Sequence, residues 1–170
     1  MAGPRSTSAV IDLSELYEAH RLGLVRMAVL LVDDFAAAED VVHDAFLALH
    51  NKSDQLRDPQ AALAYLRTSV VNGCRSALRK RRTSRNHLRL AREELADPPD
   101  RHLMLATEHA ELLACVRQLS QRQQEVLALR YWSGLSEAEI AEALGISRGA
   151  VKSNASRGLD RLESLMGALR

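Results

Sequence analysis

Apolar residues recur every three to four positions along the N-terminal half of the chain, which is the spacing of one face of an α-helix. A first helix is expected from about Asp12 to Val32 and a second from about Asp34 to His50. Asp58 is expected to cap a third helix that has Pro59 at its first position, where the missing N–H costs nothing. The predicted inward stripes are Leu13, Leu16, Leu24, Met27 and Leu31; then Phe35, Ala38, Val42, Ala45 and Leu49; then Leu63, Leu66, Val70 and Cys74.

The helical pattern breaks between Thr83 and Arg101, where two prolines stand together, and this segment is interpreted as a linker. A helix is expected to resume from about Leu103 to Gln118. The pattern therefore predicts an all-α fold of two small helical domains joined by a flexible linker. The expected ranges are 10–86 for an N-terminal module of three to four helices, 87–102 for the linker, and 103–168 for a C-terminal module of four helices.

Two capping-box signatures mark helix starts in the C-terminal module. Ser120 with Gln123 begins a helix that is expected to end near Trp132, and Ser136 with Glu139 begins the next. A Ser or Thr at the cap and a Glu or Gln three positions later satisfy two backbone N–H groups reciprocally, so each pair predicts a helix N-terminus.

The segment from Ser136 to Arg161 has the spacing of a helix-turn-helix. Ala141 is small where two helices would cross, Gly145 can supply the positive φ of a tight turn, and Val151 can anchor the second helix. An ordinary αα-hairpin is the simpler interpretation. Residues 144–159 contain no acidic side chain, however, and this favours a DNA-binding unit. The side chains expected to face a major groove are Arg148, Lys152, Ser153, Ser156 and Arg157.

Composition supports a helical protein, because 46% of the 170 residues are hydrophobic and only 4% are aromatic. The longest apolar run, Met27 to Val32, is far shorter than a membrane span, and the polar segment from Met1 to Ser8 does not resemble a signal peptide. We therefore expect a cytoplasmic protein. Cys74 and Cys115 are too far apart in sequence for a CxxC pair and are expected to pack as small apolar side chains.

The net charge of +1 conceals a sorting of charge into blocks. Residues 33–44 hold five acidic residues and no Lys or Arg, whereas residues 65–92 hold nine Lys and Arg residues and no acidic one. Residues 93–111 are acidic again. Such alternation argues for different partners at different surfaces.

The basic block lies on the predicted third helix, where Arg67, Arg75, Arg79 and Arg82 share one face. Phosphates are a natural partner, because each neutralised phosphate releases a condensed counterion. A solvated helix end that complements the helix dipole is the simpler alternative, but nine unopposed charges exceed what a helix end requires.

The acidic block places carboxylates around apolar residues on the predicted second helix. A solvated acidic face is one interpretation, and a protein-docking surface with an apolar centre and a charged rim is the other. Asp40, His43 and Asp44 lack the second cluster that a metal site would need. No nucleophile with a base, Gly-rich phosphate loop or paired-carboxylate site occurs, so no enzymatic activity, cofactor or metal is expected.

Three segments occur in a characteristic order: AEDVVHDAFLAL, then AYLRTSVVNGCRSALRKRR, then LSQRQQEVLALRYWSGLSEAEIAEALGISRGAVKSNASRGLDRL. Together they resemble the bacterial extracytoplasmic-function sigma factors, which belong to the sigma-70 superfamily. The resemblance extends from about Leu13 to Leu165. The third segment alone also fits other helix-turn-helix regulators, whereas all three in this order are specific to the family.

The resemblance implies a promoter-specificity subunit that binds the clamp and flap regions of core RNA polymerase, promoter DNA and an anti-sigma factor, without membrane insertion. The resemblance assigns polymerase docking to residues of the second helix: Glu39, Asp40, Val42, Asp44, Phe46 and Leu47. It assigns recognition of the minus-ten element to Asn72, Arg75, Arg79, Lys80 and Arg82. The loop from Asn51 to Asp58 is expected to hold a flipped base. The minus-thirty-five element falls on Arg148, Lys152, Ser153, Ser156 and Arg157, and the acidic linker residues Glu93, Glu94, Asp97 and Asp100 are expected to mimic nucleic acid.

Two other functions remain as alternatives. A stand-alone helix-turn-helix regulator would have no use for the acidic and then basic N-terminal module. A protein that sequesters polymerase or another regulator without contacting DNA would have no use for Lys152, Arg157 and the RKRR tract. Asn154 stands where many members of the family carry a basic residue, and this difference leaves the upstream recognition sequence open.

Overall fold

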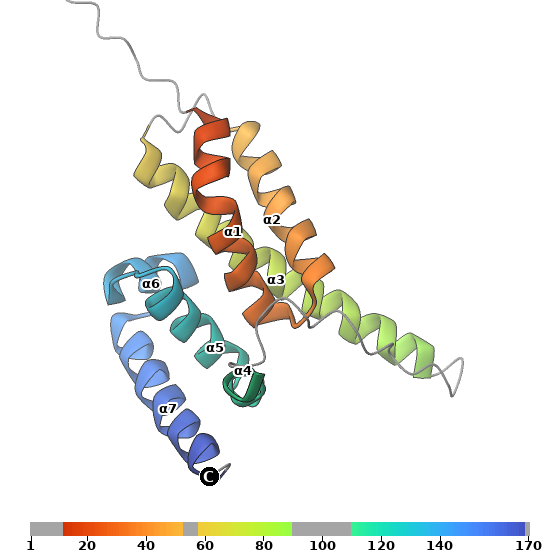
Figure 1. Ribbon diagram of the computed structural model, residues 1–170, viewed down its shortest axis with the longest axis vertical. Helices are drawn as coiled ribbons and strands as arrows, with labels where there is room; N and C mark the ends of the chain where they lie inside the picture. The colour runs from red at the N-terminus through yellow and green to blue at the C-terminus, as the bar shows by residue number, and fades with distance from the viewer. Residues whose placement is uncertain (1–11, 53–57, 90–109, 169–170) are drawn as a thin grey trace, which may run out of the picture.

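The computed structural model describes residues 12–52, 58–89 and 110–168, and all regular structure in these ranges is helical. The N-terminal bundle consists of α1 (Leu13–Val32), α2 (Phe35–His50) and α3 (Pro59–Arg89). The C-terminal group consists of α4 (Ala110–Arg117), α5 (Gln121–Leu127), the π-helical turn η2 (Ala128–Trp132), α6 (Glu137–Leu144) and α7 (Arg148–Gly167) (Figure 1). The predicted all-α fold with two helical regions is confirmed.

Helix α3 is longer than the sequence analysis predicts. The expected linker begins at Thr83, but the helix continues to Arg89. No Gly or Pro lies between these two residues, so nothing in the local sequence stops the helix there. The rest of the predicted linker lies outside the described residues, and the helix expected from Leu103 is described only from Ala110 onward.

Aspartates set the starts of the first two helices. Asp12 Oδ1 accepts the backbone N–H groups of Ser14 and Glu15 at 2.9 and 3.2 Å and so caps α1. Asp33 then takes a left-handed backbone conformation, with φ of 53°, and the next residue, Asp34, caps α2 by accepting the N–H of Ala37 at 2.9 Å. This two-residue turn makes α1 and α2 antiparallel neighbours.

The three N-terminal helices enclose a close-packed core. Met27 of α1, Leu49 of α2 and Leu66 of α3 have no exposed surface. Helices α2 and α3 pack closely at Gly73, where a Cβ would lie 2.6 Å from Cγ1 of Val41. The interior of this bundle is therefore apolar and filled.

A second small core lies between the C-terminal helices. Leu129, Ile140 and Val151 have no exposed surface, and each comes from a different element of the group. Gly158 of α7 lies against α5, and a Cβ on it would approach Cδ1 of Leu127 to 2.9 Å. These contacts fix the angle at which α7 leaves the rest of the group.

The two helical groups pack against each other along α1 and α3 (Figure 1). Arg117 of α4 pairs with Asp33 at 2.6 Å, and the Ser133 hydroxyl donates to Sδ of Met27 at 3.3 Å. Arg67 of α3 donates to the carbonyl oxygen of Ser133 at 3.2 Å, and burial at this contact lowers the pKa of its guanidinium. Through these contacts the two cores join, and most buried side chains of both groups belong to one continuous apolar cluster.

No helix among the described residues combines the length and the apolar character that a membrane span requires.

Candidate nucleic-acid interface

Helices α6 and α7 form the two-helix unit that the sequence predicts. Ser136 and Glu139 close a capping box at the start of α6, and the hydrogen bonds that Glu139 accepts from the Ser136 hydroxyl and N–H lower the pKa of its carboxyl. Gly145 ends α6 in the left-handed conformation, with φ of 63°. Ser147 then caps α7 by accepting the N–H of Ala150 at 3.1 Å.

One face of α7 is buried, and the predicted DNA contacts lie on the rest of the helix surface. Val151, Ala155 and Gly158 face inward. The predicted contacts Arg148, Lys152, Ser156 and Arg157 are exposed, and Ser153 is half-buried. The exposed set contains three cations and no carboxylate, which suits a phosphate-lined groove.

Asn154 does not project from this face as a free amide. Its Nδ2 donates to the carbonyl oxygen of Ala150 one turn earlier, at 2.8 Å. The side chain is half-buried and folded along its own helix. Asn154 therefore places no free polar group at this edge of the predicted recognition surface.

The basic face of α3 is only partly exposed. The side chains that extend into solvent are Asn72, Arg79, Lys80 and Arg82. Arg81, which completes the RKRR tract, instead donates to the carbonyl oxygen of Val32 at 3.0 Å and pairs with Asp34. Arg81 thus anchors the end of α1 to α3, and hydrogen bonds from Ala37 and the charge of Arg81 lower the pKa of Asp34.

Arg75 departs from its predicted role in this arrangement. Its Nε and Nη2 donate to Glu125 Oε1 and Oε2 of α5, both at 2.6 Å, and this pairing raises the pKa of the guanidinium. Its Nη1 also donates to Oδ1 of Asn72 at 3.2 Å. The expectation that Arg75 is available to DNA is wrong for this conformation, because a carboxylate of the C-terminal group already holds its fork.

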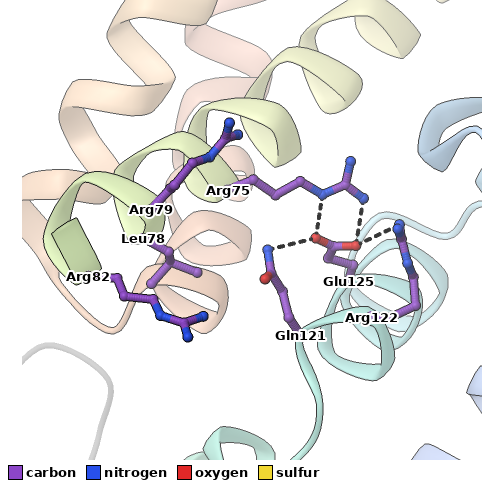
Figure 2. Close-up of a pocket in the computed structure, with 7 residues that line it drawn as sticks. All are labelled: Arg75, Leu78, Arg79, Arg82, Gln121, Arg122 and Glu125. Carbon is purple, nitrogen blue, oxygen red and sulfur yellow. Dashed lines mark hydrogen bonds and ion pairs between the residues drawn. The ribbon is translucent and has the colours of Figure 1, made fainter.

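Glu125 is a functional candidate that the sequence analysis missed. Its side chain is only 3% exposed, and it also accepts hydrogen bonds from Gln121 at 3.2 Å and Arg122 at 3.0 Å (Figure 2). Together with the basic residues of α3 it lines a cleft of about 500 Å³ between the two helical groups. The available signal was its position one turn before Leu129, which places a carboxylate on an apolar helix face.

The acidic face of α2 is narrower than predicted. Asp40, Asp44 and Leu47 are exposed, and Leu47 has half of its surface in solvent. Glu39 is half-buried and pairs with Arg21 of α1 at 2.7 Å. These positions give one exposed apolar side chain with carboxylates beside it.

Val42 and Phe46 are not part of that surface. They are 1% and 5% exposed respectively, because both point from α2 into the N-terminal core. The aromatic ring of Phe46 packs against Tyr17 of α1. The assignment of these two residues to polymerase docking is therefore wrong, since an intact bundle keeps them from any partner.

The predictions for cysteine and metal chemistry can be compared with the described residues. Cys74 and Cys115 are free thiols and both are buried. Burial, together with the charge of Glu125, raises the pKa of the Cys74 thiol to about 12, so it remains protonated at neutral pH. Within the described ranges, no three His, Cys, Asp or Glu side chains gather where they could hold a metal ion.

Some predicted sites lie outside the described residues. In the loop expected to hold a flipped base, only Asn51, Lys52 and Asp58 are described, and residues 53–57 are not. The acidic positions Glu93, Glu94, Asp97 and Asp100 also lie outside.

Comparison with known proteins connects these features. The family model for Sigma-70 region 2 matches residues 16–84, and the model for Sigma-70, region 4 matches residues 109–162. The RNA polymerase sigma-E factor of Streptomyces avermitilis is 32% identical, over 90% of this chain and 84% of that protein. The ECF RNA polymerase sigma factor SigM of Mycobacterium tuberculosis is 30% identical, over 91% of this chain and 77% of that protein.

A solved structure has the same arrangement of helices. It is the sigma factor RpoE in complex with the anti-sigma factor NepR from Bartonella quintana, with a TM-score of 0.74 and 27% identity. The match covers 94% of this chain and 99% of that one. The similarity therefore extends across both helical groups.

Proposed function

This chain belongs to the extracytoplasmic-function sigma factors of the sigma-70 family, and from that premise we propose how its surfaces divide the work of promoter-specific transcription initiation. The chain is a sigma factor that binds core RNA polymerase and promoter DNA. We assign the N-terminal module, predicted as residues 10–86 and continued by α3 to Arg89, to core docking and minus-ten recognition. The rest of the predicted linker, to residue 102, is assigned to the connection, and residues 103–168 to minus-thirty-five recognition.

The observation that carries the upstream assignment is the set of exposed cations on α7, a helix whose apolar stripe is buried. Arg148, Lys152 and Arg157 are exposed along the helix, whereas Val151 and Ala155 are buried against the rest of the C-terminal group. A helix held from behind in this way can enter a major groove and present side chains to base edges and flanking phosphates. Ser153 and Ser156 complete the proposed set.

The minus-ten element is assigned to the exposed part of α3. Arg79, Lys80 and Arg82 supply cations that can follow a DNA backbone, and Asn72 supplies a side-chain amide for a base. Arg75 joins this set only when its fork is released from Glu125. The proposed surface thus lies partly at the boundary between the two helical groups.

Core polymerase is assigned to the outward face of α2. Leu47 is the proposed apolar centre, and Asp40 and Asp44 are the proposed charged rim, with Glu39 at the edge. An exposed leucine beside carboxylates is the pattern expected where an apolar contact is oriented by opposite charge on the partner. The flap region of the polymerase is the proposed partner of the C-terminal group.

Three further properties follow from this assignment. We propose that the chain acts in the cytoplasm, where core polymerase and the promoter are found, and that it performs no catalysis of its own. An anti-sigma factor is a proposed partner, because the similar RpoE was solved with the anti-sigma factor NepR. The stand-alone regulator is not favoured, because the sigma factors that resemble this chain match it across both helical groups.

The docking assignment is tested by reversing charge on α2. The double variant Asp40→Lys with Asp44→Lys should fold normally and lose co-purification with core RNA polymerase, since both side chains are exposed. A matched control reverses two other exposed carboxylates, Glu15 and Glu18 of α1, and should still co-purify. Unchanged binding by the α2 variant would remove this face from the interface.

A further inference from the structure

The contact between the two helical groups falls on the face of α3 that is proposed to meet DNA. Of the four arginines that share this face, Arg67 donates to the Ser133 carbonyl oxygen and Arg75 donates to Glu125. The other two, Arg79 and Arg82, line the cleft beside that ion pair (Figure 2). The C-terminal group therefore covers part of the surface that the minus-ten element would use.

Glu125 of α5 joins the C-terminal group to α3 through a specific ion pair with Arg75. Its two oxygens accept hydrogen bonds from both nitrogens of the Arg75 fork, at 2.6 Å each, and further bonds from Gln121 and Arg122. It is the one charged residue that is buried within the described part of the chain. A buried carboxylate that is bonded on both oxygens holds a bidentate partner tightly and in one geometry.

We infer that the Arg75–Glu125 pair is a latch that holds the two helical groups in a closed, DNA-excluding conformation, and that a DNA phosphate competes with the Glu125 carboxylate for Arg75. This inference rests on the proposed function, because it takes the basic face of α3 to be the minus-ten surface. A carboxylate and a phosphate each present two oxygens to the same guanidinium fork, so one occupant excludes the other.

Because Arg75 cannot bind Glu125 and a DNA phosphate at the same time, the closed conformation and DNA binding exclude each other. Only the open form offers Arg75 to a phosphate, so the apparent affinity for DNA is reduced by the fraction of molecules that are closed. By linkage, DNA that binds the open form shifts the population away from the closed one. Free sigma factor is then a weak DNA binder for a reason built into its own fold.

The test compares two substitutions of a carboxylate by a carboxamide at the same interface. Glu125→Gln keeps the shape of the side chain and removes the charge that holds Arg75. Asp33→Asn does the same to the exposed pair with Arg117, and Asn tolerates the left-handed backbone at position 33. The exposed pair contributes little, so Asp33→Asn serves as the matched control.

Two measurements are made on the full chain without polymerase: the radius of gyration by small-angle X-ray scattering, and the affinity for a fluorescent single-stranded DNA of mixed sequence. Glu125→Gln is expected to raise the radius of gyration and to tighten DNA binding by about three- to tenfold, the reciprocal of the open fraction. Asp33→Asn should match the wild type in both.

A second variant separates loss of the ion pair from a folding defect caused by Glu125→Gln. Glu125→Asp keeps the charge but is one methylene too short to hold both nitrogens of Arg75, and it should move both measurements in the same direction. The inference is overturned if the folded variants scatter and bind DNA as the wild type does. It is equally overturned if both variants fail to fold, since Glu125 would then be a structural residue of the C-terminal group.

Failure of the latch is distinguishable from failure of the proposed function. If the wild-type chain with core polymerase produces promoter-specific transcripts while the Glu125 variants stay closed, the latch alone is wrong. If no transcript forms but the variants open and bind DNA more tightly, the latch stands and the assignment of the function is wrong.

Discussion

The ring of Phe46 on α2 meets the ring of Tyr17 on α1 edge to face, with centroids 4.9 Å apart and an angle of 66° between the planes. This geometry places the positive edge of one ring against the negative face of the other, which stabilises the contact beyond simple burial. The next residue, Leu47, is turned out of the core and has half of its surface in solvent. Neighbouring positions on one helix therefore serve the core and the proposed interface separately.

Alanine substitutions at these two positions should have opposite consequences. Phe46→Ala should lower the free energy of unfolding by about 3–5 kcal/mol, because it empties a packed site. Leu47→Ala should change that free energy by less than about 0.5 kcal/mol and weaken binding to core polymerase. Chemical denaturation and a pull-down with core enzyme measure the two effects, and a stable Phe46→Ala protein that no longer binds core would contradict the division.

The close approach of α2 and α3 gives a second prediction. Gly73→Ala should destabilise the protein by about 1–3 kcal/mol, because the new Cβ would lie 2.6 Å from a methyl group of the β-branched Val41. Gly23 is exposed on α1, and a Cβ added there would have no neighbour within 4 Å, so Gly23→Ala should stabilise by about 0.5–1 kcal/mol. Thermal unfolding of the pair checks both signs, and equal shifts would show that α2 and α3 do not pack as closely as described.

The recognition helix gives a third prediction. In the complex with core polymerase, Arg157→Ala should weaken binding to a matched upstream element by about 1–3 kcal/mol and leave a scrambled element less affected. Asn154→Ala should leave both affinities within about 0.5 kcal/mol of wild type, because its amide is bonded back to the Ala150 carbonyl oxygen. An equal loss on matched and scrambled templates would mean that Arg157 contacts phosphate and not a base.

The buried thiol gives a prediction for pH. The pKa of Cys74 is raised from 9.0 to about 12, so the protonated thiol contributes stability that is complete below pH 9 and is lost as the pH rises toward 12. At pH 8 on the order of one folded molecule in ten thousand carries the thiolate, so native protein should label slowly with a thiol reagent and rapidly in denaturant. The Cys74→Ala variant should lose less stability than wild type between about pH 9 and 12. Rapid labelling of native protein would contradict the buried state.

Local features were predictable from the sequence because a few neighbouring residues determine them. The capping boxes at Ser120 and Ser136 and the left-handed turn at Gly145 are all where the pattern indicates. The helical stripes likewise identify most core positions of the N-terminal bundle, since a period of 3.6 residues is visible within a single helix. Phe35, which was expected to face inward, is exposed.

The division of α2 between core and surface was only partly predictable. Val42 was expected to lie in the apolar stripe and also to dock on polymerase, and these two roles are incompatible for a side chain that is 1% exposed. Helical period alone supports the first role. The second came from resemblance to a family, which identifies a functional segment without stating which of its side chains face outward.

The contact between the two helical groups was not predictable. Arg75 and Glu125 are separated by 50 positions, and nothing in either segment identifies the other as its partner. Such a pairing depends on how two folded units meet, which one sequence does not encode in any local pattern. The same reason hides the role of Arg81, which reaches the end of α1 from the far end of α3.

The central claim is that this chain directs core RNA polymerase to promoters through two separate DNA-reading surfaces. In-vitro transcription with purified core enzyme, on a promoter library with randomised minus-ten and minus-thirty-five regions, tests it most directly. Transcripts should form only when the chain is present and should select one preferred sequence at each of the two positions, with Arg157→Ala relaxing selection at the upstream one. Transcription that is independent of the chain, or selection of a single site that the chain binds equally well without polymerase, would contradict the claim.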